Sequence, residues 1–198
     1  MICGLDEAGR GPLAGPVSAG AVILPEDFPF EILNDSKKLS EKKREAAEII
    51  IKEKACWAVS FVDHETIDRI NILEASMLAM KNAYEQLLKK LPEWLKKNAV
   101  QFDEKADLNS LVTAIADGTR CPDVPCSVKC EIKADGKYPE VMAASILAKV
   151  ARDRVMSEYD RKYPGYGYAK HKGYPTKAHR EICHKLGPSP IQRLIFNY

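Results

Sequence analysis

The chain has 198 residues, of which 45% are hydrophobic and 29% charged, and its formal net charge is +2 at pH 7. These values are ordinary for a soluble globular protein, and the length suits a domain with a substantial core. No apolar run approaches the roughly 20 residues that span a bilayer, and the first residues lack the basic and apolar regions of a signal peptide. We therefore expect a cytoplasmic protein that does not bind a membrane.

The first apolar residues lead into two adjacent carboxylates, Asp6 and Glu7, followed by the tripeptide Gly9-Arg10-Gly11. Neighbours on a strand point to opposite faces, so both acids reach one metal ion only if one uses its backbone carbonyl or the chain bends there. The glycines allow such a bend and let a substrate approach the backbone, while Arg10 offers donors suited to phosphate. The residues predict a carboxylate metal site beside a phosphate; the plainer alternative is an exposed turn.

Apolar patterning predicts three elements in the first third of the chain. Residues 17–24 are apolar and β-branched, which predicts a buried strand that pairs with the first one through a turn at 11–16. Residues 40–54 have an amphipathic pattern with Ser40 as a suitable N-cap, which predicts a helix. Residues 55–62 alternate well enough for a third strand.

A long helix is expected in the middle of the chain. Asp63 suits the cap of a short helical turn, and Asn71 followed by Glu74 is an N-cap with a capping-box partner. Apolar residues at helical spacing carry the predicted helix to about Leu91. No element is predicted for the charged stretch at 92–110.

Two further strands end at carboxylates. Residues 111–116 are typical of a strand that ends at Asp117, and residues 127–133 of one that ends just before Asp135. Pro139 suits the first turn of the long helix that follows. Strands followed by alternating helices and strands indicate an α/β fold with a mixed sheet.

Four acids thus fall at strand ends or strand–helix junctions, namely Asp6, Glu7, Asp117 and Asp135. Clustered carboxylates repel one another unless a cation lies among them, and oxygen-only ligands select Mg²⁺ or Mn²⁺. Two such ions can activate water and stabilise the leaving oxygen in phosphodiester cleavage. Asp153 lies between two arginines within a predicted helix, and we expect it to form an ion pair instead.

Basic residues outnumber acids in the last part of the chain. From Arg161 to Arg193 there are eight Lys or Arg residues against one acid, Glu181, and four tyrosines lie among them. Basic residues interleaved with aromatic rings suit a phosphate backbone and a sugar or base face, although a solvated basic tail has the same composition. We interpret 158–198 as a substrate-binding region within a single domain, 1–198.

The six cysteines are expected to be thiols, as in a cytosolic protein. Three of them, Cys121, Cys126 and Cys130, are close together in the sequence. Their spacing lacks the paired Cys-x-x-Cys knuckles of a structural zinc site, and no fourth ligand is evident, so a zinc site is disfavoured.

Five blocks in the same order resemble the motifs of type 2 ribonucleases H, and specifically the bacterial ribonuclease HII group. The resemblance spans nearly the whole chain, and five blocks in register are far more specific than one. The blocks are LDEAGRGPLAGPV from Leu5, DSKKLS from Asp35, ADGTRCP from Ala116, KADGKYP from Lys133 running into AASILAKVARD from Ala143, and YGYAKHKGYPT from Tyr166.

The resemblance implies a ribonuclease H-like fold, with a five-stranded mixed sheet flanked by helices and a small helical C-terminal region over the active site. In that family, the acids that match Asp6, Glu7, Asp117 and Asp135 hold the catalytic metal ions. The implied activity is cleavage of the RNA strand of RNA/DNA hybrids and nicking 5′ to single ribonucleotides in duplex DNA, giving 3′-hydroxyl and 5′-phosphate ends. We expect the chain to act as a monomer on these substrates.

The resemblance also implies how substrate is recognised. In the family, the residues that match Gly9-Arg10-Gly11 and Tyr174 recognise the 2′-hydroxyl at an RNA–DNA junction. Backbone groups can meet a ribose hydroxyl where no side chain blocks the approach, and a tyrosine ring can stack on the adjacent deoxyribose. Further candidate substrate contacts are four lysines, Lys37 and Lys38 in a phosphate-contact motif and Lys170 and Lys172 in the basic segment.

Two alternatives stay open from the residues alone. One is a non-catalytic module that binds RNA/DNA hybrids, although a binder of phosphate gains nothing from clustered negative charge. The other is a related two-metal nuclease for a different substrate, such as a DNA junction. The chain also departs from the family at the long stretch 92–110 and at 192–196, where Gln-Arg-Leu-Ile-Phe replaces the usual His-Arg-x-Ser-Phe and only Arg193 and Phe196 match.

Overall fold

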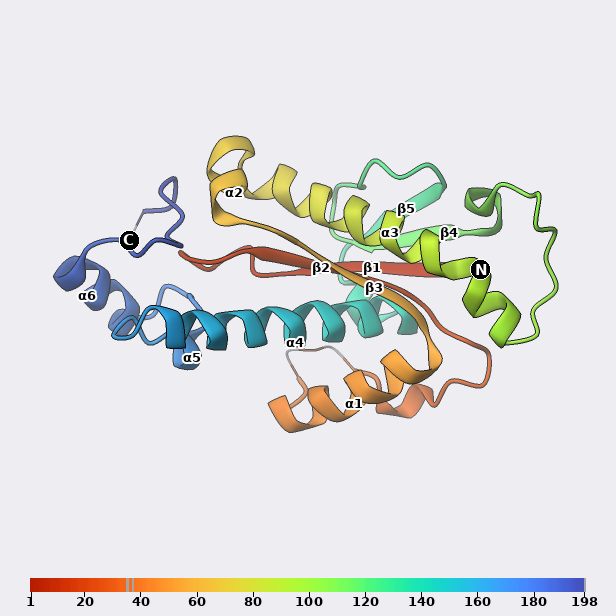
Figure 1. The fold of residues 1–198 in the computed structure, drawn as a ribbon, viewed down its shortest axis with the longest axis horizontal. Coiled ribbons are helices and arrows are strands. Elements are labelled where there is room, and N and C mark those ends of the chain that lie inside the picture. The colour runs from red at the N-terminus through yellow and green to blue at the C-terminus, as the bar shows by residue number, and fades with distance from the viewer. Residues whose placement is uncertain (35, 37, 198) are drawn as a thin grey trace.

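The computed structural model describes residues 1–34, 36 and 38–197 (Figure 1). Its five-stranded sheet has the order β3-β2-β1-β4-β5. The β1–β2 and β2–β3 pairs are antiparallel, while β1–β4 and β4–β5 are parallel, which confirms the predicted mixed sheet. The strands are β1 (Ile2–Ala8), β2 (Val17–Ile23), β3 (Cys56–Val62), β4 (Thr113–Asp117) and β5 (Ser127–Glu131).

Helices cover both faces of the sheet, with α3 on one side and α4 on the other (Figure 1). No helix in the described part of the chain is long and apolar enough to cross a membrane. The helices are α1 (Glu41–Lys54), α2 (His64–Ile70), α3 (Ile72–Lys97), α4 (Pro139–Lys162), α5 (Tyr168–His171) and α6 (Lys177–Leu186), with 3₁₀ turns η1 (Phe30–Ile32), η2 (Leu108–Leu111) and η3 (Ala134–Gly136).

The predicted helix caps are confirmed. The side chain of Ser40 accepts a hydrogen bond from the backbone of α1, and Asp63 does the same for α2. Asn71 accepts from two amides of α3, at 2.9 and 3.1 Å. Glu74 does not complete a capping box, because its carboxylate forms an ion pair with Arg120. Local side-chain chemistry therefore sets where these three helices begin.

The helix α3 is longer than the predicted one and runs through Pro92 to Lys97. A proline removes one helical hydrogen bond, but here burial outweighs that loss. Leu91 and Leu95 are fully buried, and the indole of Trp94 donates to a backbone carbonyl at 2.8 Å. Tertiary packing thus extends the helix beyond the point where the sequence pattern ends.

The two strands that precede the acids Asp117 and Asp135 are shorter than predicted. β4 begins at Thr113 because residues 108–111 form a 3₁₀ turn capped by Asp107. β5 ends at Glu131, since Lys133 has a left-handed backbone conformation (φ 60°) and residues 134–136 form another 3₁₀ turn.

The expectation that all six cysteines are thiols is wrong for two of them. Cys121 and Cys130 are joined by a disulfide, with their Cα atoms 5.4 Å apart. The parallel pairing of β4 and β5 is the physical reason, because it returns the chain so that Cys130 lies beside the end of β4. Cys3, Cys56, Cys126 and Cys183 are free thiols.

Two glycines let α4 lie close against the sheet. A Cβ atom on Gly4 would lie 2.1 Å from the backbone of Glu140, and one on Gly20 would lie 2.4 Å from the carbonyl oxygen of Ala144. Only glycine permits such an approach between backbones. This contact brings Ser145, the next residue of α4, to the end of β1.

Candidate active site

Two of the predicted acids lie side by side at the edge of the sheet. In the parallel β1–β4 ladder Leu5 is opposite Ala116, so Asp6 and Asp117 stand one residue further on the adjacent strands. Parallel strands end at the same edge, which is why residues more than a hundred positions apart meet here. The C-terminal helices α5 and α6 lie at the end of the molecule toward which β1 runs (Figure 1).

Asp6 is the most buried of these acids, with 5% of its surface exposed. Its Oδ1 accepts the amide of Glu7 at 2.7 Å, and the hydroxyl of Ser145 also hydrogen-bonds to it. Burial is the main reason that its pKa is raised well above the ordinary value, and the charges of Glu7 and Asp117 raise it further. The hydroxyl of Ser145 in turn lies 2.8 Å from that of Ser36.

Glu7 follows on the same strand and is paired with an arginine. Arg10 Nη1 lies 3.3 Å from Glu7 Oε1, and the arginine side chain is 49% exposed while that of Glu7 is 12% exposed. Burial raises the pKa of Glu7, the nearby Arg10 opposes that rise, and the charge of Asp117 adds to it. The chain bends only after both acids, at Gly9, whose φ of 101° is a left-handed conformation.

The third and fourth acids are connected through a backbone hydrogen bond. Asp117 Oδ1 accepts the amide of Ala134 at 2.7 Å, which docks the turn at 134–136 onto the end of β4. Asp135 is the next residue in this turn and is 7% exposed. The fold thus brings Asp117 and the Asp135 turn to the edge that carries Asp6.

A cavity of about 250 Å³ opens at this edge. It contains two of the predicted acids, the whole Gly-Arg-Gly tripeptide and the predicted tyrosine, which come from the two ends of the chain. Ser145 and Lys149 of α4 also line it, and neither was predicted as a site residue. The lining residues are Asp6, Glu7, Ala8, Gly9, Arg10, Gly11, Ser36, Ser145, Lys149 and Tyr174.

Tyr174 forms one wall of the cavity opposite the glycines. A Cβ atom on Gly11 would lie 3.8 Å from its ring, and Lys149 Nζ lies 5.7 Å from the ring centroid. Two stacked histidines hold its backbone: the Tyr174 amide donates to the His171 carbonyl, and His179 Nδ1 donates to the Tyr174 carbonyl at 2.9 Å. Burial lowers the pKa of both histidines.

None of the three predicted lysines in the described residues, Lys38, Lys170 and Lys172, lines the cavity. Lys38 and Lys170 are exposed, and Lys37 lies outside the described residues. The ammonium of Lys172 donates to Ser157 of α4 at 2.8 Å, so it is directed at that helix. Of the predicted basic contacts that the structure describes, only Arg10 lines the cavity beside the acids.

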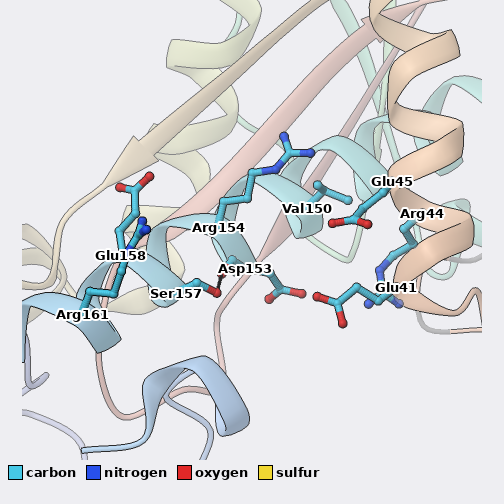
Figure 2. A pocket seen from close by; sticks show the side chains of 9 residues that line it. All are labelled: Glu41, Arg44, Glu45, Val150, Asp153, Arg154, Ser157, Glu158 and Arg161. Carbon is cyan, nitrogen blue, oxygen red and sulfur yellow. Dashed lines mark hydrogen bonds between the residues drawn. The ribbon is translucent and has the colours of Figure 1, made fainter. Parts of the chain in front are cut away.

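Asp153 forms the predicted ion pair, with its carboxylate 2.7 Å from the ammonium of Lys149. Its side chain lines a second hollow of about 320 Å³ between α1 and α4 (Figure 2). Figure 2 shows carboxylates and guanidinium groups mixed along this hollow, and Arg154 is already paired with Glu48. None of the four candidate acids lines it, so the sheet edge is the better candidate for chemistry.

The carboxylate set at the sheet edge suits a hard divalent cation. Its donors are oxygen atoms, and the pKa values of Asp6 and Glu7 are raised first by burial and then by neighbouring negative charge, which a cation would offset. Asp6, Glu7 and Asp117 are each held by a donor of the chain, and no three His, Cys, Asp or Glu side chains in the described residues converge on one point. The residue types fit a hard divalent cation, and the carboxylates would have to turn toward the ion to bind it.

Comparisons with known proteins agree with the motif resemblance. A family model described as Ribonuclease HII matches residues 3–198. A ribonuclease HII from Treponema denticola is 52% identical over 200 residues, which cover 99% of this chain and 98% of that protein. One from Dechloromonas aromatica is 48% identical over 199 residues, which cover 99% and 90%.

Solved structures share the fold. A ribonuclease H2 from Pyrococcus horikoshii superposes with a TM-score of 0.68 at 26% identity, over 99% of this chain and 93% of that one. The structure of a PCNA:RNase HII complex from Archaeoglobus fulgidus matches with a TM-score of 0.67 at 27% identity, over 100% and 96%. These likenesses confirm the predicted ribonuclease H-like fold.

Proposed function

The chain belongs to the ribonuclease HII family, and we propose that Asp6, Glu7, Asp117 and Asp135 hold the divalent metal ions of its catalytic centre. Its activity is that of the family, endonucleolytic hydrolysis of RNA paired with DNA. One observation carries the assignment of the acids: Asp6 and Glu7 are buried together at one sheet edge, and Asp117 adds a further negative charge to both.

The metal ions are proposed to be Mg²⁺ or Mn²⁺, since the family is metal-dependent and these hard ions prefer carboxylate oxygens. When bound, they supply an activated water molecule and stabilise the leaving oxygen of the phosphodiester. Ser145 orients Asp6 through its hydrogen bond, and the Ala134 amide orients Asp117. The chain's own donors thus hold these carboxylates in place.

Arg10 is proposed to move from Glu7 to a phosphate of the substrate. An ion pair with a half-exposed arginine contributes little stability, so a phosphate can compete for it. The planar guanidinium can meet a phosphate with two hydrogen bonds. This exchange would free the Glu7 carboxylate for its proposed role as a ligand.

Recognition of the RNA–DNA junction is proposed to lie across the cavity, between the Gly9-Arg10-Gly11 backbone and the Tyr174 ring. The two glycines leave the backbone open to a ribose 2′-hydroxyl, which both donates and accepts hydrogen bonds. The ring across from Gly11 offers an apolar face for the neighbouring deoxyribose. The proposed substrates are therefore RNA/DNA hybrids and duplex DNA with embedded ribonucleotides.

We propose that the chain acts as a monomer, because one chain by itself brings Asp6, Glu7, the Gly9-Arg10-Gly11 tripeptide and Tyr174 together in one cavity. Within the single proposed domain, 1–198, the region 158–198 supplies Tyr174 and exposed basic side chains such as Lys170. Lys37 and Lys38 are also proposed to contact phosphate.

Nicking of a DNA duplex with one central ribonucleotide tests the proposal. The wild type should nick 5′ to the ribonucleotide with Mg²⁺ or Mn²⁺ and not with a chelator. Asp117→Asn should lose at least about 100-fold in rate, because metal stabilisation of a transition state amounts to several kcal/mol. The same variant should still bind an RNA/DNA hybrid.

Glu131 offers a matched control acid. It stands opposite Asp117 in the β4–β5 ladder, but its carboxylate is paired with Lys129 and Lys137, which hold its pKa at about 2. Glu131→Gln should keep near-wild-type nicking. Equal activity of folded Asp117→Asn and wild type would remove Asp117 from the metal site, and hybrid binding without any metal-dependent nicking would favour the non-catalytic binding module.

A further inference from the structure

Arg193 is fully buried beneath the loop that carries the Gly-Arg-Gly tripeptide, in a segment whose sequence reads as part of a basic tail. Its guanidinium has five N–H groups, and the structure gives it five carbonyl acceptors at 2.7–3.1 Å. Those carbonyls all belong to residues 9–16. They are the carbonyls of Gly9, Arg10, Pro12, Gly15 and Pro16.

The guanidinium of Arg193 is held mainly by backbone carbonyls, and its Cζ also lies 5.3 Å from the centroid of the Phe196 ring. Among the described residues no carboxylate forms an ion pair with it, and the carboxylate of Asp68 instead accepts the amides of Leu194 and Ile195. Burial of a charge is costly unless hydrogen bonds satisfy it, and here the fork of donors is fully used. Burial and the nearby Arg152 lower the pKa of Arg193 to about 9, so it remains a cation at neutral pH.

The hydrogen bonds from Arg193 fix the direction of two peptide groups at the cavity. In a planar trans peptide the C=O and the following N–H point in opposite directions. The carbonyls of Gly9 and Arg10 point toward the guanidinium of Arg193. The amides of Arg10 and Gly11 therefore point away from it, toward the exposed side of the loop. Both residues line the cavity, and neither amide has an acceptor among the described residues.

We infer that Arg193 is a positioning residue for ribose recognition: it turns the Arg10 and Gly11 amides into the cavity as donors for the 2′-oxygen. The inference rests on the proposed role of Gly9-Arg10-Gly11. It adds that junction specificity depends on one arginine from the far end of the chain. A lysine cannot replace it, because an ammonium has three donors and no planar fork.

Arg152 provides the matched control. It is also buried and also holds this loop, but through the carbonyls of Ala14 and Pro16, and it reaches Lys172 as well. Arg152→Lys should therefore weaken the fold much as Arg193→Lys does. Only Arg193→Lys should release the carbonyls of Gly9 and Arg10.

The test is binding to two DNA duplexes of the same sequence, one with a single central ribonucleotide and one without, in a chelator so that nothing is cleaved. Wild type should prefer the ribonucleotide duplex. Arg193→Lys should lower that preference by about tenfold while its affinity for the all-DNA duplex stays within about twofold. Arg152 Cζ also lies 6.0 Å from the centroid of the Tyr174 ring, and Arg152→Lys keeps a cation there, so this variant should keep the preference. Circular dichroism establishes that each variant is folded at the temperature used.

The outcomes distinguish the proposed ribose contact of the tripeptide from the inferred role of Arg193. If wild type shows no preference, the proposed ribose contact of the tripeptide is wrong and the inference falls with it. If wild type prefers the ribonucleotide and folded Arg193→Lys prefers it equally, the inference alone is overturned. If Arg193→Lys does not fold, amide hydrogen exchange in the wild type tests whether the Arg10 and Gly11 amides are free to donate to the ribose.

In that exchange experiment, the Arg10 and Gly11 amides should exchange faster than the amide of Leu13, which donates to the Gly173 carbonyl at 2.8 Å. The ribonucleotide duplex should slow both, and the all-DNA duplex should not. Slow exchange in the free protein, or no protection by the ribonucleotide, would contradict outward-facing donors.

Discussion

The acidic sheet edge and the loop at 9–16 form two sides of one cavity, and each contains buried charge. At the edge, Asp6 is buried next to other negative charges, and its pKa is raised by that surrounding. Beneath the loop, the buried Arg193 has an acceptor in the loop for every N–H group of its guanidinium. The negative charge at the edge is not fully compensated and suits an added cation. The charge of Arg193 is satisfied by hydrogen bonds to the loop, which suits a fixed recognition surface.

The largest effect should come from Asp6→Asn, which tests whether the edge is strained by its own charge. Cleavage should fall by at least about 100-fold because a metal ligand is lost. The metal-free protein should nevertheless gain stability at neutral pH, since a raised acid pKa means that stability falls as pH rises through the folded value. About 1 kcal/mol would raise Tm by roughly 2–4 °C in a chain of this size.

The measurement is thermal unfolding of wild type and Asp6→Asn in a chelator and with Mn²⁺. Mn²⁺ should raise the Tm of wild type more than that of the variant. A variant that is less stable than wild type in the chelator would show that Asp6 is held by favourable contacts, and the contrast between edge and loop would be lost.

Tyr174→Ala should have the next largest effect, and it tests the recognition side. The ring is proposed to set the position of the scissile phosphate, and a displacement of about 1 Å can cost on the order of 100-fold in rate. The loss should be larger for a single embedded ribonucleotide than for a long hybrid, where neighbouring ribose contacts also set the register. Rates on both substrates measure this, with Tyr174→Phe as the control that keeps the ring. Small, equal losses on both substrates would mean that Tyr174 only packs.

The exposed lysines should have a smaller effect, visible in salt dependence. Replacing Lys170 and Lys177 by Ala should lower the slope of log affinity against log salt by about 1.8 in total, at about 0.9 for each phosphate contact. Lys172→Ala should leave the slope unchanged, because its ammonium is engaged by Ser157. Binding of a DNA duplex at several salt concentrations measures both. An unchanged slope for the double variant would make this segment a solvated surface.

The smallest effect should be a pH dependence of the stability that His171 and His179, which hold the backbone of Tyr174, contribute. Burial lowers the pKa of His171 and His179 below the ordinary 6.5, so their contribution to stability is present above that value and is lost as pH falls through the window below it. Each group can change stability by at most about 1.4 kcal/mol per pH unit. Compared with wild type, His179→Asn should unfold with a flatter Tm profile as the pH falls below 6.5. Parallel profiles would show that His179 does not titrate there.

Sequence alone determined much of the sheet and the acids. Alternating and β-branched runs predicted the strands, and short polar side chains before helical patterns predicted caps that the structure confirms, such as Ser40 and Asn71. These features depend on neighbours within a few residues, so they can be read from local sequence. The motifs also identified Asp6 and Asp117, and strand ends explain why such acids meet at one edge.

Tertiary structure decided what surrounds those acids. Arg193 matches a family motif but has no role that the sequence indicates, and only the folded chain supplies its carbonyl partners, 177–184 positions earlier. Leu91 and Leu95 likewise carry α3 past Pro92 because the core buries them, and strand pairing brings Cys121 and Cys130 together. Burial and long-range hydrogen bonds depend on the whole fold, so no local pattern could have predicted them.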